Sequence, residues 1–350
     1  MNLKRKIQNG EKIGVALLGA TGMVGQAFAW MLARHPWFRL SVVAASEKRK
    51  GQRYGDTVDW RLPVSLPRQA ADLQVEAITG DWRLLNERGV DIVFSALPSS
   101  LAAQVEPELR REGFYVFSNA GALRMEENVP VVIPEVNAGS LEKIRKQGFP
   151  DGGFVVCNAN CSTTGLALAL APLRTFGIRE VSVSTYQSIS GAGYPGLSAL
   201  DIMNNVIPFI DREEEKIVVE SRKILGEQFP IYPHCVRVPV AFGHLETVWV
   251  TLDGAVALRQ AREAFVEFGY EDGDLPSLPA RPLILEQRET YPQPTYCFAG
   301  HPGGMPVWIG RLRVEGDRIG FVLLVNNIVR GAAGGSIANA EAFVELIGGE

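Results

Sequence analysis

The chain has 350 residues, of which 46% are hydrophobic and 21% charged, and its formal net charge is −4. This length predicts two domains, and the lack of a basic excess argues against a dedicated nucleic-acid binder. Four cysteines do not make a disulfide framework, and every apolar run is too short to cross a membrane, so we expect a cytoplasmic globular protein.

The first regular pattern along the chain predicts a dinucleotide-binding turn. Residues 13–18 (IGVALL) are a continuous apolar run, typical of a parallel strand that is covered on both faces. Glycines follow, and then apolar residues at helical spacing, so the backbone can approach a pyrophosphate at a helix N-terminus. The spacing G-x-x-G-x-x-G is also compatible with a plain tight connection between strand and helix. The candidate cofactor residues here are Gly19, Thr21, Gly22, Met23 and Val24.

The second predicted strand, residues 39–46, indicates which dinucleotide is bound. It ends in small residues and Ser46, and Lys48 and Arg49 follow closely. An acidic residue at this place would bind a free ribose 2′-hydroxyl, whereas basic residues favour the 2′-phosphate of NADP. A solvated basic turn is the alternative, and Glu47 between the basic residues is compatible with it.

Strands and helices continue to alternate as far as residue 157. Strands are expected at 90–100, 114–121 and 129–137, with helices after the first and over 140–148. This alternation predicts an α/β fold with a Rossmann-like parallel sheet and right-handed crossovers. Ligands of such sheets collect at the carboxyl ends of strands, which adds Ser95 and Leu97 to the candidate cofactor residues.

The segment 156–165 (VCNANCSTTG) holds two of the four cysteines. A strand is expected to end just before Cys161 and a helix to begin there, which favours a thiolate at that position. Cys157 lies within the strand and is expected to be a small buried hydrophobe. A nucleophilic Cys161 is favoured by its polar neighbours, while an inert cysteine, a disulfide and a metal ligand stay open. The other cysteines and the histidines form no second compact pair of ligands, so no metal is predicted.

Partners for a nucleophilic cysteine lie further along the chain. The strand-like segment that begins at residue 181 carries Gln187, whose amide could hold a carbonyl oxygen. Two strand-like runs over 235–252 place Arg237 and His244 on either side of a break at residues 242–243. A histidine titrates near neutral pH and is the usual acid/base beside a thiolate, and an arginine can clamp a carboxylate or phosphate. A structural histidine and a surface ion pair are the alternatives. Cofactor, cysteine, histidine and arginine together predict acyl transfer to cysteine followed by hydride reduction.

Seven segments of the sequence carry a resemblance to a known family. They are residues 19–25 (GATGMVG), 117–137, 158–165 (NANCSTTG), 187–196 (QSISGAGYPG), 205–217, 237–246 (RVPVAFGHLE) and 330–341. On these segments the chain resembles the aspartate-β-semialdehyde dehydrogenase family, in its archaeal and fungal-type branch, over nearly its whole length.

The resemblance implies roles for particular residues. Cys161 would form the acyl-enzyme, His244 would be the acid/base and Gln187 would orient the substrate. Substrate-binding roles are implied for Arg237, Glu213 or Glu214, Lys216, Asn119 and Arg124, and further cofactor-binding roles for Ser190, Gly191 and Asn327. The family reaction is the reduction of 4-phospho-L-aspartate by NADPH to aspartate semialdehyde and phosphate, in lysine, threonine, methionine and diaminopimelate biosynthesis.

The resemblance also implies a domain division and an assembly. Residues 1–157, with the C-terminal helix 326–350, would bind NADP, and residues 158–325 would form an α+β catalytic and dimerisation domain with a mixed sheet. We expect a homodimer or homotetramer. The segments 291–297 and 326–331 depart from the family pattern. Malonyl-CoA reductase, N-acetyl-glutamyl-phosphate reductase and a non-catalytic NADP-binding relative are the alternatives.

Overall fold

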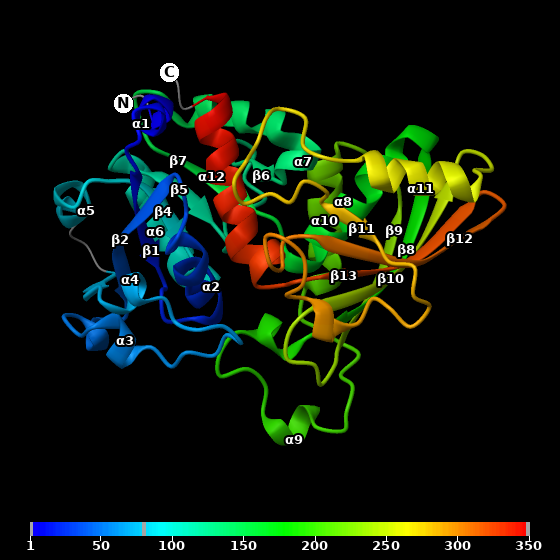
Figure 1. Ribbon diagram of the computed structural model, residues 1–350, viewed down its shortest axis with the longest axis horizontal. Coiled ribbons are helices and arrows are strands. Elements are labelled where there is room, and N and C mark those ends of the chain that lie inside the picture. Colours follow the sequence, from blue (N-terminus) through cyan, green and yellow to red (C-terminus); the bar gives the residue numbers. More distant parts are fainter. Residues whose placement is uncertain (1–2, 79–81, 348–350) are drawn as a thin grey trace. The chain divides into compact units, whose positions relative to one another are not determined.

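The computed structural model describes residues 3–78 and 82–347 and divides the chain into two compact units. The first unit comprises Met1–Val132, Ala138–Asn158 and Ala333–Glu350, and the second comprises Ile133–Asn137 and Ala159–Ala332 (Figure 1). Residues 326–332, which we grouped with the cofactor domain, lie in the second unit. The division of function between the two units stays a prediction.

The first unit is built on a seven-stranded sheet in the order β3-β2-β1-β4-β5-β7-β6, in which every strand pair is parallel. Its strands are β1 (Ile13–Leu18), β2 (Phe38–Ala45), β3 (Val75–Ala77), β4 (Val90–Ser95), β5 (Tyr115–Ser118), β6 (Val131–Val132) and β7 (Phe154–Asn158). All six residues of β1 are buried, as its apolar run predicted. The strand order reverses direction between β1 and β4, which is the point where such sheets bind ligands. The predicted Rossmann-like fold is confirmed.

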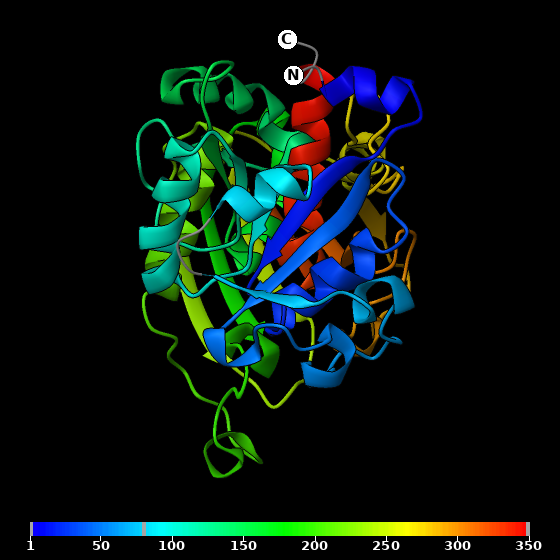
Figure 2. The same cartoon turned by 90° about the vertical axis from the view of Figure 1, so that its left-hand side faces the viewer.

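Helices and helical turns surround this sheet. They are α1 (Leu3–Gln8), α2 (Met23–Leu32), η1 (Glu47–Arg49), α3 (Tyr54–Thr57), α4 (Arg68–Ala71), α5 (Arg83–Glu87), α6 (Ser99–Arg111), η2 (Ala138–Gln147) and α12 (Gly334–Leu346). Helix α12, red in Figures 1 and 2, packs against β5, β7 and α2, so the C-terminal helix belongs to the first unit.

Two expected elements differ from the structure. The strand expected over 129–137 is wrong, because only Val131–Val132 is extended and the helical turn α7 (Pro134–Asn137) follows. Proline is favoured in the first turn of a helix, so Pro134 ends the strand and begins the helix. The helix expected over 140–148 is a 3-10 segment, η2.

The second unit is built on a mixed six-stranded sheet in the order β11-β12-β13-β10-β8-β9. Its strands are β8 (Ile178–Gln187), β9 (Ile231–Arg237), β10 (His244–Leu252), β11 (Leu283–Leu285), β12 (Val307–Glu315) and β13 (Arg318–Val325). Strand β10 alternates between buried and partly exposed residues along its whole length. Such alternation shows that one face of the sheet is covered and the other is more open.

Helices cover the buried face of this sheet. The helical elements of the unit are α7, α8 (Cys161–Leu170), η3 (Ala171–Phe176), η4 (Ile189–Ala192), α9 (Ala199–Ile202), α10 (Glu213–Leu225), α11 (Leu258–Glu267), η5 (Pro294–Tyr296) and the π-helical turn η6 (Val329–Ala333) at the unit boundary. Helix α8 packs on β10, β12 and β13 and against α10, and only Cys161 of its ten residues is not buried. Among the described residues, no helix has the length and apolar composition that a membrane span needs.

Candidate active site

Helix α8 begins at Cys161, as the sequence predicted. The side chain of Asn160 caps the helix, because its carbonyl oxygen accepts hydrogen bonds from the amides of Ser162 (3.0 Å) and Thr163 (3.1 Å). A cap of this kind satisfies amides that have no partner within the helix. The cap therefore fixes the first turn of the helix, and with it the position of the Cys161 thiol.

Helix α10 holds the capping residue in place. The backbone amide of Asn160 donates to Glu220 (2.7 Å), and its side-chain amide donates to Glu213 (2.8 Å). Both carboxylates come from α10 and both are buried. Two helices are thus tied together by hydrogen bonds at the residue that precedes Cys161.

His244, the first residue of β10, contacts the cysteine. Its Nε2 lies 3.2 Å from Sγ of Cys161, and its Nδ1 accepts a hydrogen bond from the backbone amide of Ser188 (3.1 Å). Since an amide can only donate, Nδ1 carries no proton and the single proton of the neutral ring lies on Nε2. The Nε2–H group therefore donates to the sulfur.

The environment of His244 keeps the imidazole neutral. Its complete burial, with a smaller contribution from the charge of Arg237, lowers the pKa of His244 to about 3. The near-neutral pKa expected for this histidine is therefore wrong, because burial penalises the charged ring. At pH 7 the pair consists of an uncharged imidazole that donates to sulfur.

Two more predicted residues lie beside His244 on the covered face of the sheet. Gln187 on β8 pairs with Arg237 on β9, and Tyr186 pairs with Leu245, the residue after His244. The guanidinium of Arg237 is nearly buried and donates to the Ser188 carbonyl at 2.7 Å. The sheet register therefore brings the glutamine, the arginine and the histidine into one row.

Helix α10 separates the two glutamates that the resemblance left as alternatives. Glu213 accepts hydrogen bonds from Asn160 (2.8 Å) and Gln187 (3.2 Å), and it forms an ion pair with Lys216 (3.2 Å). These donors hold the pKa of Glu213 below its usual value, although burial acts in the opposite direction and is the largest single influence. Glu214 instead accepts the backbone amide of Cys235 (3.1 Å). Glu213 is therefore the glutamate that faces the cysteine site.

The turn after β8 is connected to the histidine by hydrogen bonds. Asn327 donates to the Ser190 hydroxyl (2.9 Å) and accepts the amide of Gly243 (2.9 Å), the residue before His244. A side chain at Gly191 would place its Cβ 2.9 Å from Nη1 of Arg237, so only glycine leaves that guanidinium its space. Ser190, Gly191 and Asn327, predicted to bind the cofactor, thus lie in the second unit beside the histidine.

The glycine turn of the first unit has the geometry expected for a pyrophosphate. Gly19 has a φ of +75°, and a Cβ there would lie 2.5 Å from the Ala96 carbonyl oxygen after β4. Helix α2 begins at Met23, and no side chain caps it at Gly22. No side chain of residue 22 therefore occupies the first backbone amides of α2. Amides that are left open in this way at a helix N-terminus can bind an anion.

The other predicted cofactor residues of this unit lie at the same edge of the sheet. Ser95 ends β4, which is the neighbour of β1, and Leu97 follows two residues later. Ser46 and Lys48 follow β2 and are exposed, while the guanidinium of Arg49 donates to the Thr57 carbonyl. Lys48 lies just after β2 and forms no ion pair within the described chain. Its ammonium group can therefore bind the 2′-phosphate of a dinucleotide, so the residues present fit NADP.

Asn119 and Arg124 follow β5 in the first unit. Arg124 is buried and donates to the Asn119 carbonyl at 2.8 Å. The Asn119 side chain donates to Ser336 (3.0 Å) and accepts from Asn158 (3.3 Å). The two predicted phosphate-binding residues are therefore adjacent and held by their own unit.

Four residues of the cysteine site were not singled out from the sequence. Asn160 carries a signal that could have revealed it, because an asparagine directly before a predicted helix is a typical cap. Glu220 and Ser188 form hydrogen bonds with Asn160 and His244, which are distant from them in sequence. Residue 331 must be glycine, because a Cβ at this position would lie 2.7 Å from the Cβ of Cys161. No sequence pattern signals these three contacts.

The remaining cysteines are all free thiols, so the disulfide alternative is wrong. Cys157 is fully buried in β7, as expected. Burial raises the pKa of Cys235 and of Cys297 to about 12, which makes both unreactive. Within residues 3–78 and 82–347 no three potential ligand side chains are grouped as a metal site requires.

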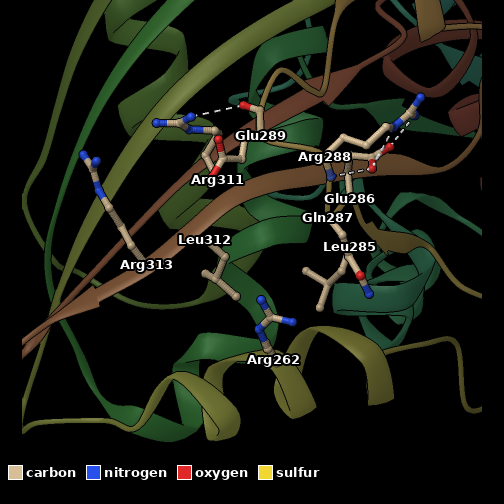
Figure 3. Close-up of a pocket in the computed structure, with 9 residues that line it drawn as sticks. All are labelled: Arg262, Leu285, Glu286, Gln287, Arg288, Glu289, Arg311, Leu312 and Arg313. Carbon is tan, nitrogen blue, oxygen red and sulfur yellow. Dashed lines mark hydrogen bonds and ion pairs between the residues drawn. The ribbon is translucent and has the colours of Figure 1, made fainter.

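A pocket of about 280 Å³ lies elsewhere in the second unit, between α11 and the loop after β11 (Figure 3). It is lined by Arg262, Leu285, Glu286, Gln287, Arg288, Glu289, Arg311, Leu312 and Arg313. Arg288 forms an ion pair with Glu286, and Arg311 donates to the Glu289 carbonyl. None of the predicted site residues lines this pocket.

A parallel sheet with a glycine turn before a helix, and a cysteine in contact with a buried histidine, are the two parts expected of a cysteine-dependent dehydrogenase. Residues 14–144 match the family model described as semialdehyde dehydrogenase, NAD binding domain, and residues 170–330 match semialdehyde dehydrogenase, dimerisation domain. The chain belongs to the semialdehyde dehydrogenase family.

Individual relatives agree with the family models. The chain is 45% identical to an aspartate-semialdehyde dehydrogenase from Archaeoglobus fulgidus over 95% of this chain and 98% of the relative. It is 36% identical to a malonyl CoA reductase (NADP) from Metallosphaera sedula, over 94% and 96%. The structure of aspartate semialdehyde dehydrogenase with NADP from Candida albicans is similar with a TM-score of 0.84, at 30% identity over 95% of this chain and 98% of that chain.

Proposed function

We propose that the chain is an aspartate-semialdehyde dehydrogenase that reduces 4-phospho-L-aspartate with NADPH to the semialdehyde and phosphate. The Sγ–Nε2 distance of 3.2 Å between Cys161 and His244, at a capped helix N-terminus, carries the proposal. The similarity to the A. fulgidus enzyme over nearly the full length of both chains supports the substrate.

The cysteine is the residue that reacts. Its thiolate attacks the acyl carbon, the carbon–oxygen bond to phosphate breaks, and a thioester and inorganic phosphate result. Bound NADPH supplies the hydride that reduces the thioester. The carbon–sulfur bond then breaks, the aldehyde leaves and the thiolate is restored. In both steps the His244 Nε2–H group stabilises negative charge on sulfur, because its second nitrogen is held as an acceptor by Ser188.

Other residues bind the two ends of the substrate. In the second unit, Gln187 and Arg237 lie in the row that includes the histidine, and we assign them to the substrate carbonyl and carboxylate. Glu213 is assigned to the substrate amine in preference to Glu214, and Lys216 to phosphate. In the first unit, Asn119 and Arg124 are assigned to phosphate. The glycine turn, Ser46 and Lys48 are assigned to NADP.

The proposal is tested by following NADPH formation from aspartate semialdehyde, phosphate and NADP, with malonyl-CoA reduction measured in parallel. We expect turnover of the semialdehyde only. Cys161→Ala should abolish it, whereas Cys157→Ala, the matched change at a buried cysteine, should retain it. Reduction of malonyl-CoA without turnover of the semialdehyde would favour the activity named for the M. sedula relative.

The second unit is also the proposed site of self-association, because a dimerisation-domain model matches residues 170–330. We propose that the more open face of its sheet, where Tyr186 and Tyr232 are exposed, forms the interface of a homodimer or homotetramer. The green segment 193–210 in Figures 1 and 2 extends from the strands of this unit and exposes Leu200 and Phe209. Light scattering on the parent protein and on Tyr232→Lys would test the interface, and an unchanged mass would contradict it. A cytoplasmic location stays an expectation.

A further inference from the structure

Glu246 is a fully buried carboxyl group two residues after His244 on β10. Residues two apart on a strand point to the same face, so Glu246 lies on the covered face that carries the histidine. No cation pairs with it in the described part of the chain. A carboxyl group in this position calls for an explanation, because burial without a partner opposes folding.

The surroundings of Glu246 come from five other elements. Across the sheet, Thr185 on β8 pairs with both Glu246 and Cys235 on β9, and Leu323 on β13 pairs with Glu246 from the other side. Ser162 on α8 and Glu213 on α10 also act on this carboxyl group. The titratable groups around it are thus Glu213, Cys235 and His244, none of which is a cation at pH 7.

These surroundings favour the protonated form of Glu246. Burial raises the pKa of Glu246 well above its usual value, and the charge of Glu213 raises it further, while the Ser162 hydroxyl has a weaker opposite effect. Burial and the nearby charge of Glu213 thus both favour the neutral acid, which has one hydrogen-bond donor and one carbonyl acceptor.

Three neighbouring polar atoms lack partners. Neither oxygen of Glu246 has a hydrogen-bond partner of good geometry, and the hydroxyl of Ser162 has none either. The hydroxyl lies close enough to influence the Glu246 pKa. Buried polar groups are almost always paired, and α8 packs on β10, so the Ser162 hydroxyl and the Glu246 carboxyl group are candidate partners for each other.

We propose that Glu246, as a neutral acid, donates a hydrogen bond to the Ser162 hydroxyl and is a positioning residue for Cys161. The proposal rests on the proposed role of Cys161 as nucleophile. Cys161 and Ser162 are consecutive residues in the first turn of α8. Strand β10 would then hold this turn at two points, His244 at the sulfur and Glu246 at the next side chain. The Asn160 cap holds this turn from the chain that precedes it, and the two contacts from β10 would hold it from the sheet.

Four single variants, together with the double variant Glu246→Leu/Ser162→Ala, test the proposal. Glu246→Gln keeps a neutral donor of nearly the same shape, Glu246→Leu removes the donor at similar volume, and Ser162→Ala removes its partner. Val248→Ala is the matched control, because Val248 is the next buried residue on the same face of β10. The readouts are kcat, KM and the rate of Cys161 alkylation by iodoacetamide from pH 5 to pH 9, with the alkylated residue identified by mass spectrometry.

Glu246→Leu should lower kcat by roughly 10- to 100-fold with KM nearly unchanged, because a small displacement of a reacting group costs this much. Its alkylation profile should move to higher pH, since the thiol is no longer aligned with the helix N-terminus. Ser162→Ala should have the same direction of effect, and the double variant should be no worse than Glu246→Leu alone. Glu246→Gln should restore the parent values, and Val248→Ala should lower Tm without moving the alkylation profile.

Two results would overturn the proposal. Glu246→Leu with the parent kcat and alkylation profile would make Glu246 a space-filling residue. Glu246→Gln as impaired as Glu246→Leu would show that an ionised carboxylate is needed. If Glu246→Leu does not fold, Glu246→Gln and Ser162→Ala still decide between these outcomes. Alkylation of Cys161 needs no substrate. If the parent protein did not turn over the semialdehyde, the proposed function would be refuted, but the alkylation profiles of the variants could still be compared with that of the parent.

Discussion

Asn160 joins the first turn of α8 to α10, and its replacement should affect stability and cysteine reactivity together. In Asn160→Ala the two cap bonds at 3.0 and 3.1 Å are lost, which costs about 1 kcal/mol. The bond from its amide to Glu213 is also lost, which costs about 1.5 kcal/mol for a charged acceptor. We expect the free energy of unfolding to fall by roughly 2.5 kcal/mol, and Tm by about 5 °C.

Asn160→Asp tests the contact with Glu213 by replacing the neutral amide donor with a negative charge. The aspartate keeps an acceptor for the two amides, but it places an oxygen where the donor to Glu213 lies 2.8 Å away. Two negative charges this close repel by about 6 kcal/mol at an effective dielectric constant near 20, so one of the two carboxylates binds a proton instead. A pKa raised in the folded state means that the folded protein binds more protons than the unfolded chain. The stability of Asn160→Asp relative to the parent should therefore increase as the pH falls from 7 to 5.

Urea unfolding followed by tryptophan fluorescence at pH 5 and pH 7 measures the free energy of unfolding of both variants. The rate of Cys161 alkylation by iodoacetamide measures the reactivity of the thiol. Asn160→Ala should be alkylated with a changed pH profile as well as unfold earlier. If Asn160→Asp has the same stability relative to the parent at both pH values, the contact with Glu213 is not formed. A parent-like Tm and alkylation profile for Asn160→Ala would refute the reasoning on the cap.

Three further predictions follow from the same geometry. The His244 ring, with a pKa of about 3, should not titrate between pH 5 and pH 8 by NMR. Because the unfolded chain binds this proton near pH 6.5, stability should fall by up to about 1.4 kcal/mol per pH unit from pH 6.5 towards 3, and His244→Asn should flatten that dependence. Gly331→Ala, whose Cβ would lie 2.7 Å from that of Cys161, should lower kcat more than roughly tenfold, whereas a Cβ at Gly139 meets nothing within 4 Å and Gly139→Ala should not. Lys48→Ala with Arg49→Ala should raise KM for NADP but not for NAD, and an unchanged preference would contradict the assignment to the 2′-phosphate.

Much of the fold was predictable because it depends on local patterns. The apolar run of residues 13–18 is a buried strand, and the apolar positions that follow Cys161 are a buried helix. Helix α10 ends at Leu225, where Gly226 takes the positive φ that is typical of the residue after a helix. The prediction failed over 129–137, where valines favour a strand but Pro134 starts a helical turn. Local preference is reliable where neighbouring residues agree and not where they conflict.

The candidate site was predictable in its membership and not in its chemistry. Cys161, Gln187, Arg237 and His244 could be proposed from residue type and resemblance, and the structure brings them together in one unit. The choice between Glu213 and Glu214 depends on which of two adjacent helical residues faces the helix that carries the cysteine. The sequence contains no information on that orientation until the two helices are packed.

The sequence by itself determined most strands of the first unit, the helix that begins at Cys161 and the types of side chain that the reaction needs. These follow from periodicity and from the chemistry of single residues. Only the tertiary structure decided the protonation states, because they depend on burial and on distant neighbours. It removes water from His244 and so keeps the imidazole neutral, and it directs the Ser188 amide to Nδ1 so that the proton lies on the side of the sulfur. It also buries Glu246 on the face that carries His244, where burial raises the pKa of the carboxyl group well above its usual value.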